Sequence, residues 1–270
     1  MIAARFIPAC TVAVSAMSRN TSQRVGLFVT CLVDLMRPSV GFAALKLLQS
    51  AGYEVAVPDT QTCCGQPGFN SGDRPAARCL AEKVIGEFEA FDYVVAPSGS
   101  CAGQIKLHYP ELFGDAPAWR RRAEALASKT YELTDFLASV AGMKDPPGRF
   151  AGKLTYHDCC SGLRELGVKQ QPRQLIGAMP EVELQEMDEC QTCCGFGGTF
   201  AIKYGEISAR LADNKCRNIA ANGAGTVALG DLGCLLNIEG RLRRGGDSTT
   251  QVLHVAELLA GVTPADIEGV

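Results

Sequence analysis

Short apolar runs alternate with longer amphipathic segments along this chain from residue 25 onward. The apolar runs predict buried strands, and they occur at residues 25–30, 54–57, 93–96, 153–156, 181–184 and 225–229. Apolar side chains at helical spacing predict helices at residues 42–49 and 75–91, and a third helix with one apolar face formed by Phe200, Tyr204, Ile207 and Leu211. Strands that alternate with helices indicate an α/β fold with mainly parallel sheets, in which loop chemistry lies at the carboxyl ends of strands.

The chain carries one cysteine pattern twice. A single cysteine is followed by a Cys-Cys-Gly triplet and then by another cysteine, first as Cys31, Cys63-Cys64-Gly65 and Cys101, and again as Cys160, Cys193-Cys194-Gly195 and Cys234. The single cysteine precedes its triplet by 32 positions in the first set and by 33 in the second. We therefore predict two similar βαβ-type repeats, residues 25–142 and 153–263, related by pseudo-two-fold symmetry. A Pro- and Gly-containing segment at residues 142–152 would link them.

Composition narrows the chemistry to these cysteines. The 270 residues include 26 basic and 29 acidic side chains and 13 cysteines. The near balance of charge argues against a nucleic-acid-binding surface, and the sequence has no apolar run of the roughly 18 to 20 residues that cross a bilayer. A chain of this length can bury a full core without a disulfide scaffold, and adjacent cysteines rarely bond to each other without strain. We therefore expect reduced thiols that bind metal, in a reducing compartment such as the cytoplasm.

Residues 1–24 differ from the rest of the chain. They contain no acidic side chain, many Ser and Thr residues, and the arginines Arg5, Arg19 and Arg24. This composition is also typical of an organelle transit peptide, so targeting stays open. We predict a disordered N-terminal extension or a start assigned upstream, with no role for Cys10.

The repeated pattern suits a metal centre in each repeat. Parallel strands would bring three cysteine loops to one sheet edge, where four thiolates could surround an iron–sulfur cluster. The adjacent cysteines of each triplet diverge, which suits different irons of one cluster, and the following glycine permits a sharp turn of the backbone. Four thiolates also suit zinc. Structural zinc sites usually have two C-x-x-C pairs, and the first repeat has none, so clusters are the leading interpretation and zinc is the alternative.

At these residues the chain resembles the cysteine-rich CCG family, which includes a cysteine-rich component of heterodisulfide reductase and the iron–sulfur subunit of glycolate oxidase. The family motif is C-x(n)-C-C-G-x(m)-C-x-x-C, present twice. The resemblance spans residues 25–260 and is closest to the lactate-utilisation members. It rests on residues 27–34, 63–67, 70–72, 97–101, 131–136 and 193–200. The resemblance implies cluster binding by eight cysteines, which are Cys31, Cys63, Cys64, Cys101, Cys160, Cys193, Cys194 and Cys234.

Departures from the family motif bear on the type of cluster. In heterodisulfide reductase the terminal C-x-x-C supplies an extra cysteine that permits a non-cubane cluster, and Ser98 and Asp231 take its place here. Four thiolates per repeat favour two [4Fe–4S] clusters, although the cluster type in the second repeat stays open. Cys190 could add a fifth ligand to the second repeat, or it is an accessory thiol. Asp231 could replace a thiolate on iron, or face solvent or a backbone amide.

Further candidates surround the second repeat. The family segment Tyr-His-Asp-Pro-Cys reads Tyr156-His-Asp-Cys-Cys160 here, so Cys160 takes the ligand position and Cys159 is left outside the ligand set. His157 could tune the second cluster through a hydrogen bond or relay a proton, or it is a structural histidine. Cys79 and Cys216 lie in helical stretches away from the motif, and we expect buried core thiols there.

The sequence lacks a flavin or nicotinamide fingerprint and any triad or paired carboxylates singled out by spacing. Oxidation of a 2-hydroxy acid usually requires a hydride acceptor, whereas clusters pass single electrons. Together with the resemblance, this favours an iron–sulfur electron-transfer component of an L-lactate oxidation system. Its partners would be the other lactate-utilisation subunits, an iron–sulfur protein and a small third component. The alternatives are a cluster-based disulfide or quinone reductase and a zinc-stabilised interaction module without redox activity.

Overall fold

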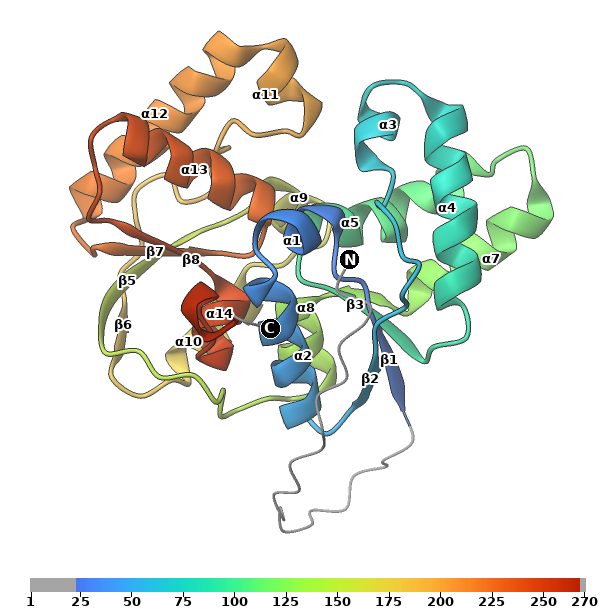
Figure 1. Ribbon diagram of the computed structural model, residues 1–270, viewed down its shortest axis with the longest axis horizontal. Helices are drawn as coiled ribbons and strands as arrows, with labels where there is room; N and C mark the ends of the chain where they lie inside the picture. Colours follow the sequence, from blue (N-terminus) through green and yellow to red (C-terminus); the bar gives the residue numbers. More distant parts are fainter. Residues whose placement is uncertain (1–22, 268–270) are drawn as a thin grey trace.

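The computed structural model describes residues 23–267, in which two four-stranded sheets are formed entirely by parallel pairs (Figure 1). The first sheet has the order β2-β1-β3-β4, from β1 (Arg24–Leu27), β2 (Glu54–Ala56), β3 (Tyr93–Ala96) and β4 (Thr130–Glu132). The second has the order β6-β5-β7-β8, from β5 (Gly152–His157), β6 (Val182–Leu184), β7 (Thr226–Leu229) and β8 (Gln251–His254). The second order repeats the first, so the predicted α/β class with two similar repeats is confirmed. The predicted N-terminal extension and Cys10 lie outside the described residues, except for residues 23 and 24.

The six predicted strands are all present, with ends shifted by up to three residues. The largest shift is in β1, which ends at Leu27 rather than at residue 30. The chain turns at Thr30, whose φ is 76°, and its hydroxyl accepts the amide proton of Val33 at 3.4 Å to begin α1 (Cys31–Met36). A positive φ is uncommon for a β-branched residue, and this turn directs Cys31 away from the sheet.

Helices fill the connections between strands. In the first half, besides α1, they are α2 (Ser39–Ser50), α3 (Gln66–Asn70), α4 (Arg74–Phe88), α5 (Gly99–Gly103), η1 (Gln104–His108), α6 (Tyr109–Leu112), α7 (Pro117–Ser128), α8 (Leu133–Asp135) and η2 (Phe136–Val140). In the second half they are α9 (Cys160–Arg164), α10 (Gln170–Gly177), α11 (Thr199–Lys203), α12 (Gly205–Asn222), α13 (Leu232–Arg244), α14 (Val255–Ala260) and η3 (Pro264–Ile267). No helix among the described residues combines the length and the apolar character needed to cross a bilayer.

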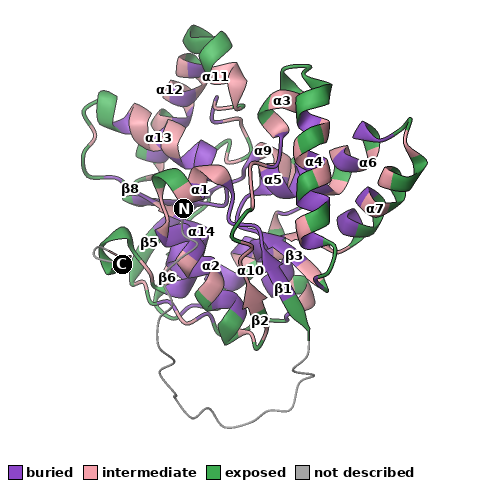
Figure 2. Cartoon of the chain, turned by 45° about the vertical axis from the view of Figure 1, so that its right-hand side comes forward, coloured by how far each residue is buried: buried purple, intermediate pink, exposed green. Residues whose placement is uncertain are grey.

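The main core lies where the two halves meet. Helix α2 packs against α14, and α10 packs against α8 and η2, so each half contributes helices to the same apolar layer. Leu27 and Phe136 from the first half and Leu154 and Leu258 from the second belong to this one cluster. Figure 2 shows buried residues concentrated around α2, α10 and α14. A second cluster, which includes Phe88, lies under α4, α6 and α7.

The cysteine-bearing helices of the two halves also touch. Helix α5, which contains Cys101, lies against α9, which begins with Cys160. A Cβ atom at Gly99 would lie 2.8 Å from the Cα atom of Gly162, closer than real Cβ atoms come to backbone. Glycine at position 99 therefore permits the approach that brings the two metal-binding edges together.

The predicted helix around residues 200–211 is wrong in two respects. The chain breaks between α11 and α12 at Tyr204, whose φ and ψ are −129° and 53°. The proposed apolar face does not form either, because Tyr204 is 56% exposed and Ile207 is 55% exposed. Helical spacing of apolar residues reports only a local pattern, and no other element of the described chain covers this face.

Candidate metal centres

The first group of thiols lies at the carboxyl ends of three adjacent strands. Cys31 begins α1 after β1, Cys63 and Cys64 lie in the loop after β2, and Cys101 lies in the first turn of α5 after β3. Because β2, β1 and β3 are parallel neighbours, these loops meet at one sheet edge. The structure thus brings together the four cysteines that the sequence predicts for the first centre.

Thiol–thiol hydrogen bonds connect all four side chains. The Sγ atoms of Cys64 and Cys101 are 3.4 Å apart. A hydrogen bond from Cys31 lowers the pKa of Cys63 to about 3, while the same bond raises the pKa of Cys31 far above its ordinary value. The hydrogen bond to Cys101 is the largest cause of the raised pKa of Cys64. One thiolate in each such group is therefore already formed at neutral pH, and thiolate is the form that binds metal.

The second group repeats this arrangement. Cys160 begins α9 after β5, Cys193 and Cys194 follow β6, and Cys234 lies in the first turn of α13 after β7. A hydrogen bond from Cys160 lowers the pKa of Cys193 to about 2 and raises that of Cys160. Cys194 hydrogen-bonds to both Cys193 and Cys234. The four cysteines predicted for the second centre are thus also brought together.

Both groups are buried on one side and open on the other. Cys64 and Cys101 are buried whereas Cys31 and Cys63 are half-buried, and the second group shows the same division. The first two motif positions thus form an accessible edge, through which a metal or a redox partner can approach.

The glycine after each cysteine pair makes the turn possible. Gly65 has a φ of 84° and Gly195 a φ of 91°, which favour glycine. A Cβ atom at Gly195 would lie 2.5 Å from the carbonyl oxygen of Ser208 on α12, and one at Gly65 would lie 3.3 Å from that of Ala77 on α4. The predicted reason for the glycine, room for the backbone, is present in both halves.

Each pair is also held from behind, by different side chains. The hydroxyl of Tyr109 donates to the Cys64 carbonyl at 2.9 Å, and the Nδ2 of Asn237 donates to the Cys194 carbonyl at 2.8 Å. Fixed carbonyls orient the adjacent thiols, so both residues are positioning residues for the cysteine pairs.

Ser98 and Asp231 lie at the helix N-termini rather than on a metal. Each caps its own helix: the Ser98 hydroxyl accepts the Cys101 amide proton at 3.3 Å, and the Asp231 carboxylate accepts that of Gly233 at 3.1 Å. They also meet across the halves, because the Ser98 hydroxyl donates to Asp231 at 2.9 Å. The alternative in which Asp231 binds a backbone amide describes this arrangement.

Cys190 faces a salt bridge instead of the thiol group. Burial and the nearby Asp158 and Glu186 carboxylates raise its pKa. Asp158 is fully buried and forms a two-pronged ion pair with Arg173, with N–O distances of 2.8 and 2.9 Å. Cys190 therefore belongs to the polar surroundings of the second centre, in the place of an accessory thiol.

Two residues beside the second group have a larger part than the sequence pattern indicates. Cys159 hydrogen-bonds to Cys234, so a fifth thiol joins the group that the prediction limited to four. His157 is completely buried, and burial lowers its pKa to about 3. Donor atoms of His157, Cys159 and Cys234 all lie within 4.8 Å of one another. The adjacent cysteines at residues 159 and 160 were the sequence signal that could have pointed to this enlargement.

A buried cation completes the second site. Lys215 on α12 is 1% exposed, and its Nζ donates to the Glu189 carbonyl at 2.5 Å. Burial lowers its pKa, whereas the nearby thiols of Cys190 and Cys194 act in the opposite direction. A buried ammonium near several thiolates offsets part of their mutual repulsion.

The two cysteines expected in the core are less buried than predicted. Cys79 on α4 is exposed, so its prediction is wrong. Cys216 on α12 is half-buried, with its pKa raised to about 11 mainly by burial. Helical position alone did not report which face of α4 Cys79 occupies.

The donor sets fit a thiophilic metal. All twelve cysteines among residues 23–267 are free, and the 3.4 Å between Cys64 and Cys101 is well beyond the roughly 2.05 Å of a disulfide. The raised pKa values of Cys31, Cys64, Cys160 and Cys194 reflect the cost of placing several thiolates together. A bound cation removes that cost, because it favours the deprotonated form of every ligand.

Comparisons with known proteins agree with this arrangement. The CCG model, described as a cysteine-rich domain, matches residues 25–106 and 154–239. Lactate utilization protein A 2 of Bacillus cereus (strain 03BB102) is 44% identical over 237 residues, which cover 88% of this chain and 98% of that protein. Lactate utilization protein A of Bacillus pumilus (strain SAFR-032) is 44% identical over 236 residues, which cover 87% and 98%.

A solved structure shares the fold. The crystal structure of a hypothetical protein from Helicobacter pylori matches with a TM-score of 0.64 at 11% identity, over 88% of this chain. This chain covers 48% of that protein, about half its length, and the likeness concerns the fold alone. The family model, the repeated thiol groups and the relatives lead to one assignment: the chain belongs to the cysteine-rich CCG family, among the proteins similar to lactate utilization protein A.

Proposed function

We propose that this chain is the iron–sulfur electron-transfer component of a system that oxidises L-lactate to pyruvate. The names of its relatives point to lactate utilization. The observation that carries the proposal is that each repeat gathers four free thiols at one sheet edge, which is the donor set of a [4Fe–4S] cluster. The ligands would be the eight motif cysteines, four in each half.

The chain's own residues would hold the clusters and present them. Tyr109 and Asn237 fix the carbonyls behind the cysteine pairs, and Lys215 offsets negative charge in the second half. Bound clusters would supply acceptors for single electrons. Removal of two electrons from lactate would take place on a catalytic partner that carries a hydride acceptor. The half-buried thiols mark the edge of each centre that such a partner would approach.

Metal analysis of anaerobically purified protein tests the cofactor. We expect about four irons and four acid-labile sulfides per half, and a brown colour that bleaches with dithionite. Stoichiometric zinc without sulfide would instead support the zinc-stabilised module and overturn the proposal.

A reconstitution test separates electron transfer from catalysis. Lactate alone should leave the visible spectrum of the isolated chain unchanged, and lactate with the two partner subunits should bleach it. Bleaching by lactate without partners contradicts a purely electron-transferring role. Rapid oxidation of the reduced chain by a quinone or a disulfide would favour the reductase alternative.

A further inference from the structure

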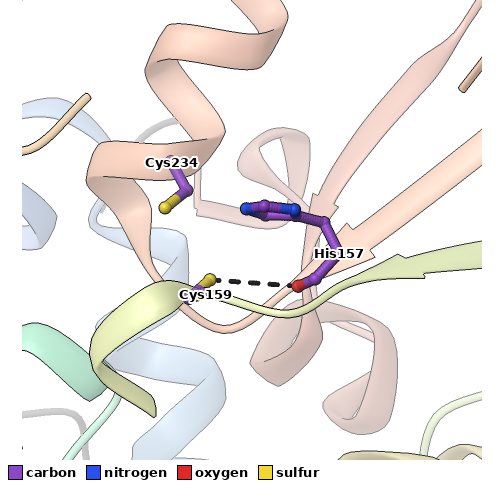
Figure 3. A group of neighbouring side chains, drawn as sticks. All are labelled: His157, Cys159 and Cys234. Carbon is purple, nitrogen blue, oxygen red and sulfur yellow. Dashed lines mark hydrogen bonds between the residues drawn. The ribbon is translucent and has the colours of Figure 1, made fainter. Parts of the chain in front are cut away.

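Three metal-binding side chains converge on one side of the second thiol group. His157 ends β5, Cys159 follows it two residues later, and Cys234 comes from the first turn of α13. Figure 3 shows the imidazole ring of His157 extending toward the thiol of Cys234, with Cys159 beside them. All three residues are buried, and one donor atom from each lies within 4.8 Å of the others.

His157 is not satisfied by the protein. Neither of its ring nitrogens has a hydrogen-bond partner among residues 23–267, although the side chain is completely buried. The nearby Cys190 carbonyl accepts the Asp158 amide proton at 3.1 Å. A buried polar group without a partner costs about 1 to 3 kcal/mol, so a structural histidine held by backbone does not describe this residue. An imidazole aimed at two thiols is explained if it binds what they bind.

The first half shows what the same position looks like without this feature. Aligning Cys31 with Cys160 places Phe28 at the position of His157 and Thr30 at that of Cys159. Phe28 packs against Phe88, with ring centroids 5.5 Å apart, and the Thr30 hydroxyl caps α1. The fold therefore needs neither an imidazole nor a thiol at these two positions.

We propose that His157, Cys159 and Cys234 form a metal-binding face of the second centre, with an imidazole nitrogen of His157 as a direct ligand. The inference deepens the proposed function and rests on it in one respect, that the second thiol group binds metal. Imidazole and thiolate together suit a thiophilic transition metal, which is either an iron of the second cluster or a single Zn²⁺. Donors around one such ion lie about 3.5 to 3.8 Å apart, so the face needs to close by only about 1 Å.

Nitrogen coupling measured on the intact chain tests this ligation directly. A Cys63→Ala background removes the first centre, so that the reduced spectrum reports the second. Electron spin-echo modulation should then show strong coupling to a directly bound nitrogen. Labelling the protein with ¹⁵N-histidine should replace that coupling with the ¹⁵N pattern. This measurement requires no change at His157, so a folding defect cannot obscure it. Coupling that is absent, or unchanged by the label, overturns iron ligation.

Substitution and metal analysis cover the zinc source. His157→Phe, which introduces the residue of the first half, should abolish the histidine coupling or remove one zinc per chain. The matched control is Thr155→Val, which removes another unpartnered buried polar atom from the same strand. If His157→Phe keeps the metal content and spectrum of Thr155→Val, the inference is wrong and the proposed function stands. If the unsubstituted chain has no iron or sulfide but holds a zinc that His157→Phe removes, the proposed function fails and the inference stands.

Discussion

The two halves share a backbone frame and a set of four thiols, yet they surround those thiols differently. At the ends of β1 and β5, the aligned positions are Phe28 and His157, Val29 and Asp158, and Thr30 and Cys159. Apolar packing thus lies behind the first centre, where a buried ion pair and an imidazole lie behind the second. The repeat therefore maintains its ligand geometry while the residues just outside the ligands are free to differ.

The helix behind each cysteine pair shows the same contrast. Gly65 approaches Ala77 and Leu80 on α4, and Gly195 approaches Ser208 and Leu211 on α12. Four residues beyond each leucine lie Val84 and Lys215, both buried. The second centre therefore has a cation where the first has an aliphatic side chain.

Removal of one cysteine from each pair provides the strongest test of whether the halves are separate. Cys63→Ala should lose the first centre and Cys193→Ala the second, because each half has its own group of thiols. We expect each variant to retain about half of the iron of the unsubstituted protein, with a different remaining electron-spin spectrum. Loss of all iron from either variant would show that the halves share one site, or that one centre supports the whole fold.

The buried ion pair should be the next most sensitive feature. Arg173→Met should lower the free energy of unfolding by about 3 to 5 kcal/mol, because it leaves the Asp158 carboxylate buried and unpaired. Asp158→Val combined with Arg173→Met imitates the first half at Val29 and should recover most of that loss. Denaturant unfolding under anaerobic conditions measures both.

The control for this pair is an exposed one. Arg120 pairs with Glu124 on α7, and both side chains are about half exposed. Arg120→Met should change the free energy of unfolding by no more than about 0.5 kcal/mol. Equal effects of the two arginine substitutions would contradict the importance of burial.

The ends of β4 and β8 predict opposite pH dependences. Glu132 caps α8, and burial raises its pKa to about 7 from an ordinary value near 4.5. The unfolded state then releases its proton first as pH rises, so Glu132 lowers stability progressively between about pH 4.5 and 7. Glu132→Gln should therefore gain stability relative to the unsubstituted protein, by about 1 to 3 kcal/mol, as pH rises from 5 to 7. A gain that does not vary with pH would show that Glu132 is already ionised throughout this range.

His254 is the counterpart in the second half and should act in the other direction. It caps α14, accepting the Ala256 amide proton at 3.2 Å, and burial lowers its pKa to about 4 from about 6.5. The unfolded state takes up a proton first as pH falls below 6.5, so His254 lowers stability toward pH 4. His254→Asn keeps a capping acceptor and should gain about 1 kcal/mol relative to the unsubstituted protein between pH 6.5 and 5. Unfolding curves at several pH values compare the two variants, and the same direction of change in both would contradict the assignment.

The repeat, the α/β class and the ligand sets proposed for the two centres could all be predicted from the amino-acid sequence. Alternating apolar runs specify parallel strands, and cysteines placed just after such strands must meet at one edge, whatever the rest of the chain does. The glycine after each pair was also readable, because a sharp turn is a local requirement. These features depend on neighbours in the chain and on the geometry of a single sheet.

Features that depend on how distant segments meet became visible only in the folded chain. Ser98 and Asp231 are 133 residues apart and form a hydrogen bond only because the two halves dock at α5 and α9. His157 and Cys159 reach Cys234 because β5 and α13 are packed together, which no spacing reports. The exposure of Tyr204 was equally hidden, since an apolar pattern shows which face of a helix is apolar and not whether another element covers it.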